Sequence, residues 1–559
     1  MPRPTADGSV SKLNAHDNPA AADSSAARPM STGEHERRQL TGRAGIVAAG
    51  TLGSRMLGLV RDQVIAASFV AASTDAFFVA FTIPNVLRQL LAEGAVQNAA
   101  LPVLERVRER SGETAARAAF AAMRGLSLLV LLVTTVIGIV FAGELVDLFA
   151  AGYRQHAGQF ERTVTLTRWL FPYIFFMGTA ALSVAALNVH RRFFVTAFAP
   201  GLLNIAFILA ALVLPSWLAA QGRDPILALA AGALLGGVLQ VVAQWPSLRR
   251  IGYLTTPRLS FAEPAVKETL RRMGPVLIGI GVYYIDVVLA RRFLSELDVG
   301  AQSYFGWAMR LCDFPQGIFV MALQAATLPS LSRLVARGEM DEVARTFTFA
   351  MRLTLFVGIA ATAACVALAE PLTVLLFQRG RFDAHSAHET ARSLVAQGLG
   401  IWMVAAVRQL VSLYYALGDT KTPVRVAAID LGVFVVCALL LRAPLGHVGV
   451  SFAVTSASFV QMVLLWWGLR ARVHVQGMSE IGRSVGKTTV AAVAAAGLAR
   501  LVATLATSSS SGAWDLAKPG VAASITFVVS FLAISWAVRS DELRVLASAT
   551  RRSRQRAAS

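Results

Sequence analysis

Long apolar segments recur along almost the whole chain, separated by short polar connections rich in arginine. Each segment has roughly 20 residues, which as an α-helix is long enough to cross about 30 Å of hydrocarbon. The pattern predicts an all-α integral membrane protein with about fourteen transmembrane helices. Their approximate centres are Gly58, Leu90, Val130, Met177, Phe207, Leu235, Val282, Phe319, Gly358, Met403, Val433, Ser458, Ala495 and Val528.

The composition agrees with this prediction. The 559 residues are 55% hydrophobic and only 15% charged, which leaves too little polar surface for an ordinary soluble protein. The formal net charge of +19 sits in short clusters between apolar segments, a distribution that argues against nucleic-acid binding. The three cysteines, Cys312, Cys365 and Cys437, all fall in apolar segments and favour buried thiols over a disulfide or a zinc site.

The basic clusters also predict an orientation. Cytoplasmic connections of membrane proteins are enriched in Lys and Arg, and with an inside N-terminus the even-numbered connections are the richer ones here. An even number of helices returns the C-terminus to the cytoplasm, so we expect a multi-pass protein of the cytoplasmic (inner) membrane with both termini inside. The same cations could also touch anionic lipids. The predicted inside segments carry Arg106, Arg108, Arg110, Arg117, Arg249, Arg250, Arg258, Lys267, Arg271 and Arg272, and the C-terminal end carries Arg539, Arg544, Arg551, Arg552, Arg554 and Arg556.

A weak internal repeat divides the apolar region. Residues 100–107 and 327–334 share a Leu-Pro pair and close the second and eighth segments, and residues 188–197 and 417–426 follow the fourth and tenth. An offset of six segments preserves orientation, so the two lobes would be parallel repeats with a site between them. The predicted parts are a disordered cytoplasmic tail (1–41, with Met30 as an alternative start), a first lobe (42–268), a second lobe (269–472), a two-helix appendage (473–540) and a basic cytoplasmic tail (541–559).

Charged side chains concentrate in the first, second and eighth segments. Charges at bilayer depth are costly, so we expect these side chains to line a polar interior. Arg55 and Arg61 differ by about 9 Å of helical rise and roughly 120° of rotation. They can therefore share a face only if the helix breaks, as Gly53 and Gly58 would permit, or if both line a wide cavity.

The second and eighth segments pair arginine with nearby polar residues. Asn85 and Arg88 are three residues apart and share a helical face, and Glu93 follows just over one turn later. Arg310 and Asp313 are also three residues apart. Arg88–Glu93 and Arg310–Asp313 could be purely structural ion pairs. A surplus of arginine would still remain, and guanidinium groups favour an anionic, phosphorylated ligand.

Two further carboxylates stand alone in the second half of the chain. Asp286 and Asp430 lie in strongly apolar segments and could bind a coupling cation or a proton. A structural partner such as Arg408, or a solvated cavity wall, is the alternative.

Two apparent motifs fail on spacing. Residues 482–488 place three residues between their glycines, where a phosphate-binding P-loop needs four. Residues 385–389 match neither of the zinc-protease spacings. A membrane glycosyltransferase would need acidic motifs in a loop, and we find none. We therefore expect neither an enzyme nor a cofactor, with transport driven by the membrane potential or an ion gradient.

From about residue 42 to residue 540 the chain resembles the MurJ (MviN) family of bacterial lipid II flippases in the MOP exporter superfamily. The matching motifs are Ser54-Arg-Met-Leu-Gly-Leu-Val-Arg-Asp62, Thr74-Asp-Ala-Phe-Phe-Val-Ala-Phe81, Pro84-Asn85 through Arg88, Ala92-Glu-Gly94 and Leu328-Pro-Ser-Leu331. The resemblance implies two six-helix lobes around a central cavity, with residues 473–540 as a groove for the isoprenoid tail.

The resemblance also implies the site. Thr82 departs from the pattern, because some relatives have a lysine there that could contact a diphosphate; Asp313 replaces a glutamate and keeps its charge. The implied cavity residues are Arg55, Arg61, Arg88 and Arg310, with Asp62, Asp75, Asn85, Glu93, Ser303 and Asp313 as polar positions.

The expected function is translocation of lipid II, the undecaprenyl-diphosphate-linked disaccharide-pentapeptide, from the inner to the outer leaflet by alternating access. A flippase for another polyprenyl-diphosphate-linked saccharide is the nearest alternative. A MATE-type cation exporter fits less well, because its substrate would require net negative charge in the cavity. The expected partners are lipid II, membrane lipids and the cell-wall synthesis or division machinery, with the protein itself a monomer.

Overall fold

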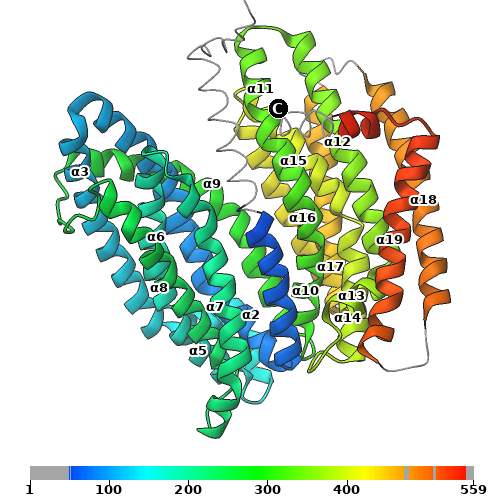
Figure 1. Ribbon diagram of the computed structural model, residues 1–559, viewed down its shortest axis with the longest axis horizontal. Coiled ribbons are helices and arrows are strands. Elements are labelled where there is room, and N and C mark those ends of the chain that lie inside the picture. The colour runs from blue at the N-terminus through cyan, green and yellow to red at the C-terminus, as the bar shows by residue number, and fades with distance from the viewer. Residues whose placement is uncertain (1–49, 51, 471–476, 508–511, 549–559) are drawn as a thin grey trace, which may run out of the picture. The chain divides into compact units, whose positions relative to one another are not determined.

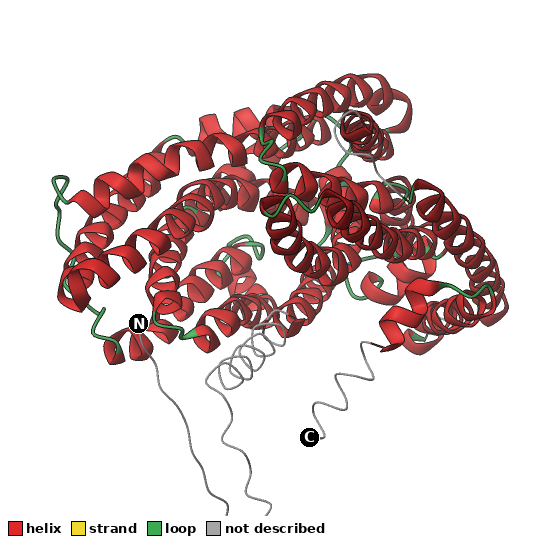
Figure 2. Ribbon diagram, turned by 90° about the horizontal axis from the view of Figure 1, so that it is seen from above, coloured by secondary structure: helices red, strands yellow, loops and turns green. Residues whose placement is uncertain are grey.

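The computed structural model describes residues 50, 52–470, 477–507 and 512–548, and among these residues every regular element is a helix (Figure 2). The predicted all-α membrane fold is confirmed. The described residues all belong to one compact unit. The predicted tail at 1–41 and most of the one at 541–559 lie outside the described residues, although 541–548 form a short helix.

The helices follow the predicted order, and each of the fourteen predicted centres falls on a helical residue. The first group, called here the first half, consists of a helix over residues 52–68, α2 (Ala71–Arg88), the π-helix η1 (Gln89–Gly94), α3 (Ala95–Val140), α4 (Ala142–Ala150), the 3₁₀-helix η2 (Ala151–Gln155), α5 (Gln159–Leu170), α6 (Pro172–Val189), α7 (Phe193–Ala220) and α8 (Leu227–Arg250). After α9 (Pro264–Ser295), the second half consists of α10 (Ala301–Pro315), the π-helix η3 (Gln316–Val320), α11 (Met321–Ala336), α12 (Met340–Ala367), α13 (Ala369–Phe377), α14 (Ala384–Gly398), α15 (Ile401–Ala416), α16 (Lys421–Leu445) and α17 (His447–Arg470), followed by α18 (Met478–Ala506) and α19 (Ala513–Ala537).

Length and hydropathy identify fewer spans than the order suggests. Within the described residues ten helices are long and apolar enough to cross a membrane, or eleven if the bent pair α14–α15 is one span. The helix over 52–68, α2 and α9 are not among these; the first is shorter than the helices that qualify, and the other two carry charge. The long α3 is two helices joined at Gly112, whose φ of 82° only glycine adopts readily.

The two predicted repeats share an irregularity. A π-helix interrupts the second predicted span at Gln89 and the eighth at Gln316. Each begins thirteen residues before the proline of its Leu-Pro pair, Pro102 or Pro329. A π-turn inside an α-helix is rare and often marks a functional position, so its recurrence at equivalent positions supports the parallel repeat.

One helix joins the two halves. α9 packs against α3 and α4 of the first half and against α16 and α17 of the second (Figure 1). The pair α18–α19 packs on α12 and α13. Its interface contains Ala491, Ala495 and Ala499, which are fully buried and let the helices approach closely.

Candidate anion-binding site

The helix over 52–68 directs its two arginines to different neighbours. It continues through Gly53 and Gly58 without interruption, so the break that these glycines would permit is absent from residues 52–68. Arg55 reaches toward η3 and α11, whereas Arg61 reaches toward α7. The helix therefore directs Arg55 to the second half of the protein and Arg61 to the first half.

Arg61 is held in one orientation by two polar partners. Its Nε and Nη2 donate to Asp62 Oδ1 at 2.9 and 2.7 Å, and its Nη1 donates to Asn204 Oδ1 at 3.0 Å. The Asn204 side chain in turn donates to the carbonyl of Ser54 at 3.0 Å and so ties α7 to the first helix. The guanidinium also lies 5.7 Å from the centre of the Phe207 ring.

Asp62 links the two halves. It is 6% exposed, and besides Arg61 it meets Arg310 of α10, with 3.7 Å between Arg310 Nε and Asp62 Oδ2. Arg310 thus forms an ion pair with Asp62, while Asp313 lies within its electrostatic range. The Arg310 side chain stays 45% exposed in a helix that is otherwise largely buried, so a ligand can reach it.

Arg55 has much weaker support. Among the described residues its guanidinium donates to the thioether sulfur of Met321, at 3.6 Å. Gly317 permits this approach, because a Cβ there would lie 1.6 Å from Arg55 Nη1. Asp313 lies within electrostatic range of Arg310, Arg408 and Arg55.

The second predicted span contributes Arg88. As the spacing predicted, Arg88 and Asn85 meet: Arg88 Nε and Nη2 donate to Asn85 Oδ1 at 3.0 and 2.8 Å. The side chain of Glu93 lies outside the described residues. Thr82 donates its hydroxyl to the carbonyl of Phe78 at 2.6 Å, which turns it toward its own helix.

Asp75 and Ser303 come together, but in a closed contact. Asp75 is 2% exposed and accepts the backbone N–H groups of Gly300 and Ser303 at 2.6 and 2.7 Å, so a carboxylate of α2 caps α10. The hydroxyls of Thr74 and Ser303 lie 2.6 Å apart. Gly300 has a φ of 103° and allows the tight turn.

A second hydrogen bond between the two halves involves Ala67, which lies shortly before Asp75 in the chain. The N–H of Arg381, in the turn before α14, donates to the carbonyl of Ala67 at 2.8 Å. Gly380 makes this approach possible, because a Cβ there would lie 2.4 Å from the Ala67 oxygen. We call these two contacts, Asp75 with α10 and Ala67 with Arg381, the outer latch, since both lie at helix ends that the charge pattern predicts outside.

The two lone carboxylates lie near each other. Asp286 of α9 and Asp430 of α16 lie within electrostatic range of each other, and Asp286 Oδ1 is buried without a hydrogen-bond partner. The described residues contain no group of three or more His, Cys, Asp or Glu side chains that could hold a metal. Backbone and amide oxygens would have to complete any cation site there. Arg408, the alternative partner considered for them, interacts with Asp313 instead.

Three polar residues of this region were missed in the sequence. Asn204 is a buried amide in the strongly apolar α7, a signal that could have been noticed. Arg408 was considered only as a partner for the lone carboxylates. Arg291 exchanges hydrogen bonds with Gln302 across the α9–α10 turn, at 2.9 and 2.6 Å, and covers the Phe78 ring.

The connected group carries a surplus of positive charge. It joins four guanidinium groups, Arg55, Arg61, Arg310 and Arg408, to two carboxylates, Asp62 and Asp313. Two positive charges are thus not neutralised within this group. Guanidinium forks match phosphate oxygens, so the group suits an anion with several such oxygens.

Known proteins resemble the chain in sequence and in fold. The family model described as "Lipid II flippase MurJ" matches residues 65–517. A lipid II flippase MurJ from Burkholderia cenocepacia is 36% identical over 434 residues, which cover 76% of this chain and 83% of that protein. The solved structure of lipid II flippase MurJ in an inward closed conformation has a TM-score of 0.71 at 21% identity and covers 88% of this chain and 99% of that one. An inward-facing MATE family multidrug resistance transporter of the MOP superfamily has a TM-score of 0.63 at 14% identity, over 78% of this chain and 99% of that one.

Proposed function

Because the chain belongs to the MurJ family of lipid II flippases, we propose that it carries lipid II from the inner to the outer leaflet of the cytoplasmic membrane. The surplus of arginine over carboxylate carries the proposal, since a diphosphate supplies the negative charge that the group lacks. The matched segment begins after Asp62, so the roles of Arg55 and Arg61 rest on their motif and their geometry.

The arrangement accounts for how a charged head group could leave water. Arg310 is exposed enough to meet an incoming diphosphate, and Arg61 is already held in a fixed orientation by Asp62 and Asn204. A prearranged cation loses little conformational freedom on binding. The isoprenoid tail stays in the lipid beside α18 and α19, and no covalent bond changes.

The position of the contacts between the two halves indicates how the halves would move during transport. The outer latch joins them at the predicted outside ends, by the contacts of Asp75 and Ala67. Within the part of the chain that the structure describes, no backbone hydrogen bond joins residues 106–117 of α3 or the start of α7, both predicted inside, to the end of α11 or the start of α12. Opening the latch while the inside ends close would expose the head group to the other side, as alternating access requires.

Purified protein in proteoliposomes tests the proposal. Lipid II placed in one leaflet should appear in the other only when the protein is present, as read by an impermeant enzyme or label added outside. Equal transport of a polyprenyl diphosphate with an unrelated saccharide would favour the broader alternative of a polyprenyl-diphosphate-saccharide flippase. Export of organic cations without lipid II transport would refute the proposal in favour of a MATE-type exporter.

The proposed orientation puts both termini in the cytoplasm. Single cysteines replacing Arg337 and Arg154 in a cysteine-free background form a matched pair, because both side chains are well exposed. An impermeant maleimide added to intact spheroplasts should label position 154 and leave position 337 unlabelled. The reverse pattern would invert the topology. A monomeric state and an association with the cell-wall synthesis or division machinery stay predictions.

Asp286 and Asp430 are the proposed cation-coupling residues. Two carboxylates within electrostatic range of each other in an apolar setting repel unless a proton or a cation lies with them. Replacing either by asparagine should change how transport depends on sodium, pH or membrane potential while head-group binding is retained. Unaltered ion dependence in both variants would remove this part of the proposal.

A further inference from the structure

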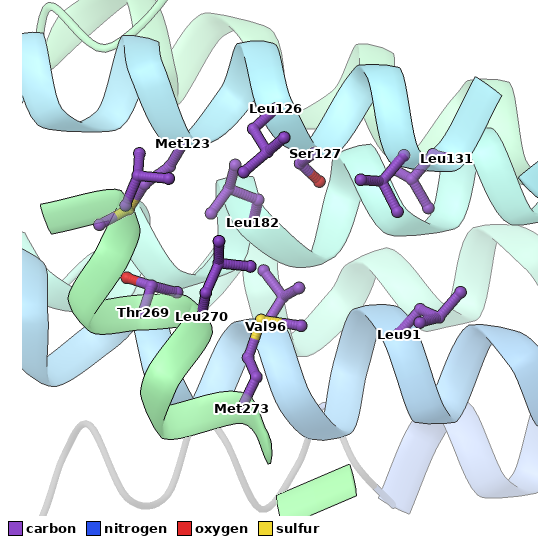
Figure 3. A pocket seen from close by; sticks show the side chains of 12 residues that line it. Leu91, Val96, Met123, Leu126, Ser127, Leu131, Leu182, Thr269, Leu270 and Met273 are labelled. Carbon is purple, nitrogen blue, oxygen red and sulfur yellow. The ribbon is translucent and has the colours of Figure 1, made fainter. Parts of the chain in front are cut away.

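A pocket apart from the arginine group lies between α3, α6 and α9, beside the π-helix η1 (Figure 3). Its cavity volume is about 90 Å³, which leaves room for a short stretch of one hydrocarbon chain. Figure 3 shows side chains from all four elements converging on it. Its lining consists of Leu91, Val96, Met123, Leu126, Ser127, Val130, Leu131, Leu182, Val266, Thr269, Leu270 and Met273.

The lining is almost entirely apolar. α9 contributes one face, with lining residues at 266, 269, 270 and 273. The hydroxyl of Thr269 donates to the carbonyl of Ala265 at 2.8 Å, so it is turned into its own helix. Water enters a cavity only where polar groups can bind it, and this lining favours a hydrocarbon ligand. Met123 and Met273 add adaptable surfaces that could follow a flexible chain.

The predicted orientation places the pocket at the depth of the inner leaflet, with its opening toward lipid. Val130 and Leu270 are 41% and 48% exposed, so they reach the surface that faces the membrane. The α9 lining belongs to the first turns of that helix, which follow the predicted inside loop at 251–263. The hydrocarbon that can reach the pocket is therefore a chain of an inner-leaflet lipid.

Positive charge lies at the same end of α9. Arg106 and Arg272 both bind Glu268, so one carboxylate serves two guanidinium groups. Lys267 and Arg271 are exposed on the same turns as the lining residues. Basic residues at the cytoplasmic ends of membrane helices attract anionic head groups.

We propose that this pocket binds one acyl chain of an anionic phospholipid of the inner leaflet, with the lipid phosphate beside Lys267 and Arg271. The bound chain lies between α9 and α3. Since α9 packs against both halves, a chain in this position supports α9 against the first half and couples lipid composition to the arrangement of the two halves. The proposal does not depend on which substrate the protein transports.

Photolabelling of the full-length protein tests it. The probe is phosphatidylglycerol with a diazirine on one acyl chain, mixed into liposomes that contain the purified protein, and cross-linked peptides are mapped by mass spectrometry. Labels should concentrate in residues 123–131 and 266–273. Leu126→Trp fills the pocket from α3 and should lower this labelling about tenfold, equivalent to about 1.4 kcal/mol. Leu132→Trp is the matched control, because Leu132 is 52% exposed and lies opposite the lining face of the same helix.

A second variant protects the test against a local folding defect. Thr269→Trp fills the pocket from α9 and should have the same effect as Leu126→Trp. Equal labelling in the two pocket-filling variants and the control would overturn the proposal, because the probe would then report only the general lipid layer. Labelling by a polyprenyl-phosphate probe in preference to phosphatidylglycerol would also overturn it. Replacing Lys267 and Arg271 by glutamine should reduce labelling to the level of a phosphatidylcholine probe, and an unchanged preference would contradict the head-group assignment.

Discussion

Asp75 and Arg55 are both charged residues of the early predicted spans, yet the protein treats them in opposite ways. Asp75 is almost completely buried, and its carboxylate accepts two backbone N–H groups at the start of α10. Arg55 donates only to a methionine sulfur within the described residues. A carboxylate whose oxygens both accept hydrogen bonds stabilises the fold, whereas a guanidinium whose partner is a weak acceptor is available to bind a ligand.

The partners of a charged residue, rather than its position in the sequence, indicate its role in this membrane protein. Sequence position identifies both residues equally, because each interrupts an apolar segment. Their partners separate them: Asp75 joins the two halves, and Arg55 belongs to the group with surplus positive charge. Removing the first should change stability and conformation, and removing the second should change ligand binding alone.

The largest structural effect is expected for Asp75→Ala. The change leaves two buried N–H donors of α10 without an acceptor, which should cost about 3–5 kcal/mol in the closed arrangement of the outer latch. Spin labels on both sides of the latch should report longer distances, and the melting temperature in detergent should fall. Asp298→Ala, an exposed carboxylate in the turn that precedes α10, is the control. Unchanged distances and melting temperature would show that the latch contributes nothing.

A smaller effect is expected at another well-satisfied carboxylate, outside the spans. Glu542 is buried and accepts hydrogen bonds from Ser484, Ser540 and Arg352, each at 2.8 Å. Burial acts to raise the pKa of Glu542, but its hydrogen bonds, that from its own backbone included, and Arg352 together lower it below the usual value. Glu542→Gln should weaken docking of the helix over 541–548 by about 1–2 kcal/mol.

The pH dependence of Glu542 sharpens the same prediction. Since the folded pKa is lowered, the stabilisation is complete at pH values above the ordinary glutamate pKa of about 4.3 and is lost as the pH falls through the lowered value. The hydrogen-exchange protection factors of residues 541–548, which are corrected for the intrinsic pH dependence of exchange, should therefore fall at acidic pH in the wild type, with little further change in Glu542→Gln. An equal fall in both proteins would assign the effect to other groups.

Asp62 is intermediate between Asp75 and Arg55, because it is buried like Asp75 but belongs to the same charged group as Arg55. The smallest of the expected effects is on ligand binding after replacement of Asp62. It orients Arg61 and also offsets part of the positive charge that faces the ligand. Asp62→Asn should strengthen binding of a soluble diphosphate about fivefold, since one more positive charge becomes available, and slow release. Asn204→Ala is the matched control: it frees the other side of Arg61 without changing the charge. Calorimetric titration with the diphosphate measures both, and weaker binding in Asp62→Asn would contradict the electrostatic account.

Much of the fold could be predicted from the sequence, because long apolar segments in a membrane have few alternatives to helices. The repeat was visible in its Leu-Pro pairs, and Asn85 with Arg88 followed from helical spacing. The contact between Asp62 and Arg310 could not be predicted, because it joins helices that are far apart in the chain. Local spacing suggested Asp313 as a partner of Arg310, which does lie within electrostatic range of it, but the ion pair that helix packing adds is with Asp62.

The same limit explains Asp75 and Arg61. A family motif identifies Asp75 as a polar position, but only the three-dimensional structure shows its carboxylate capping another helix. Arg61 and Arg55 are six residues apart, and sequence alone could not decide between a broken helix and two separate directions. The helix is continuous, so the neighbours of each arginine determine what it can do.

Lipid II binding and translocation by arginine variants test the central proposal most directly. Arg55, Arg61, Arg88 and Arg310 should each be changed to alanine and to lysine, with abundance, melting temperature, binding and translocation measured on the same preparations. The account predicts that each alanine variant accumulates normally and loses about 100-fold or more in translocation, and that lysine rescues unevenly because it restores charge without the planar fork. Full translocation in Arg55→Ala and Arg310→Ala at normal abundance would contradict the proposal that these arginines bind the diphosphate.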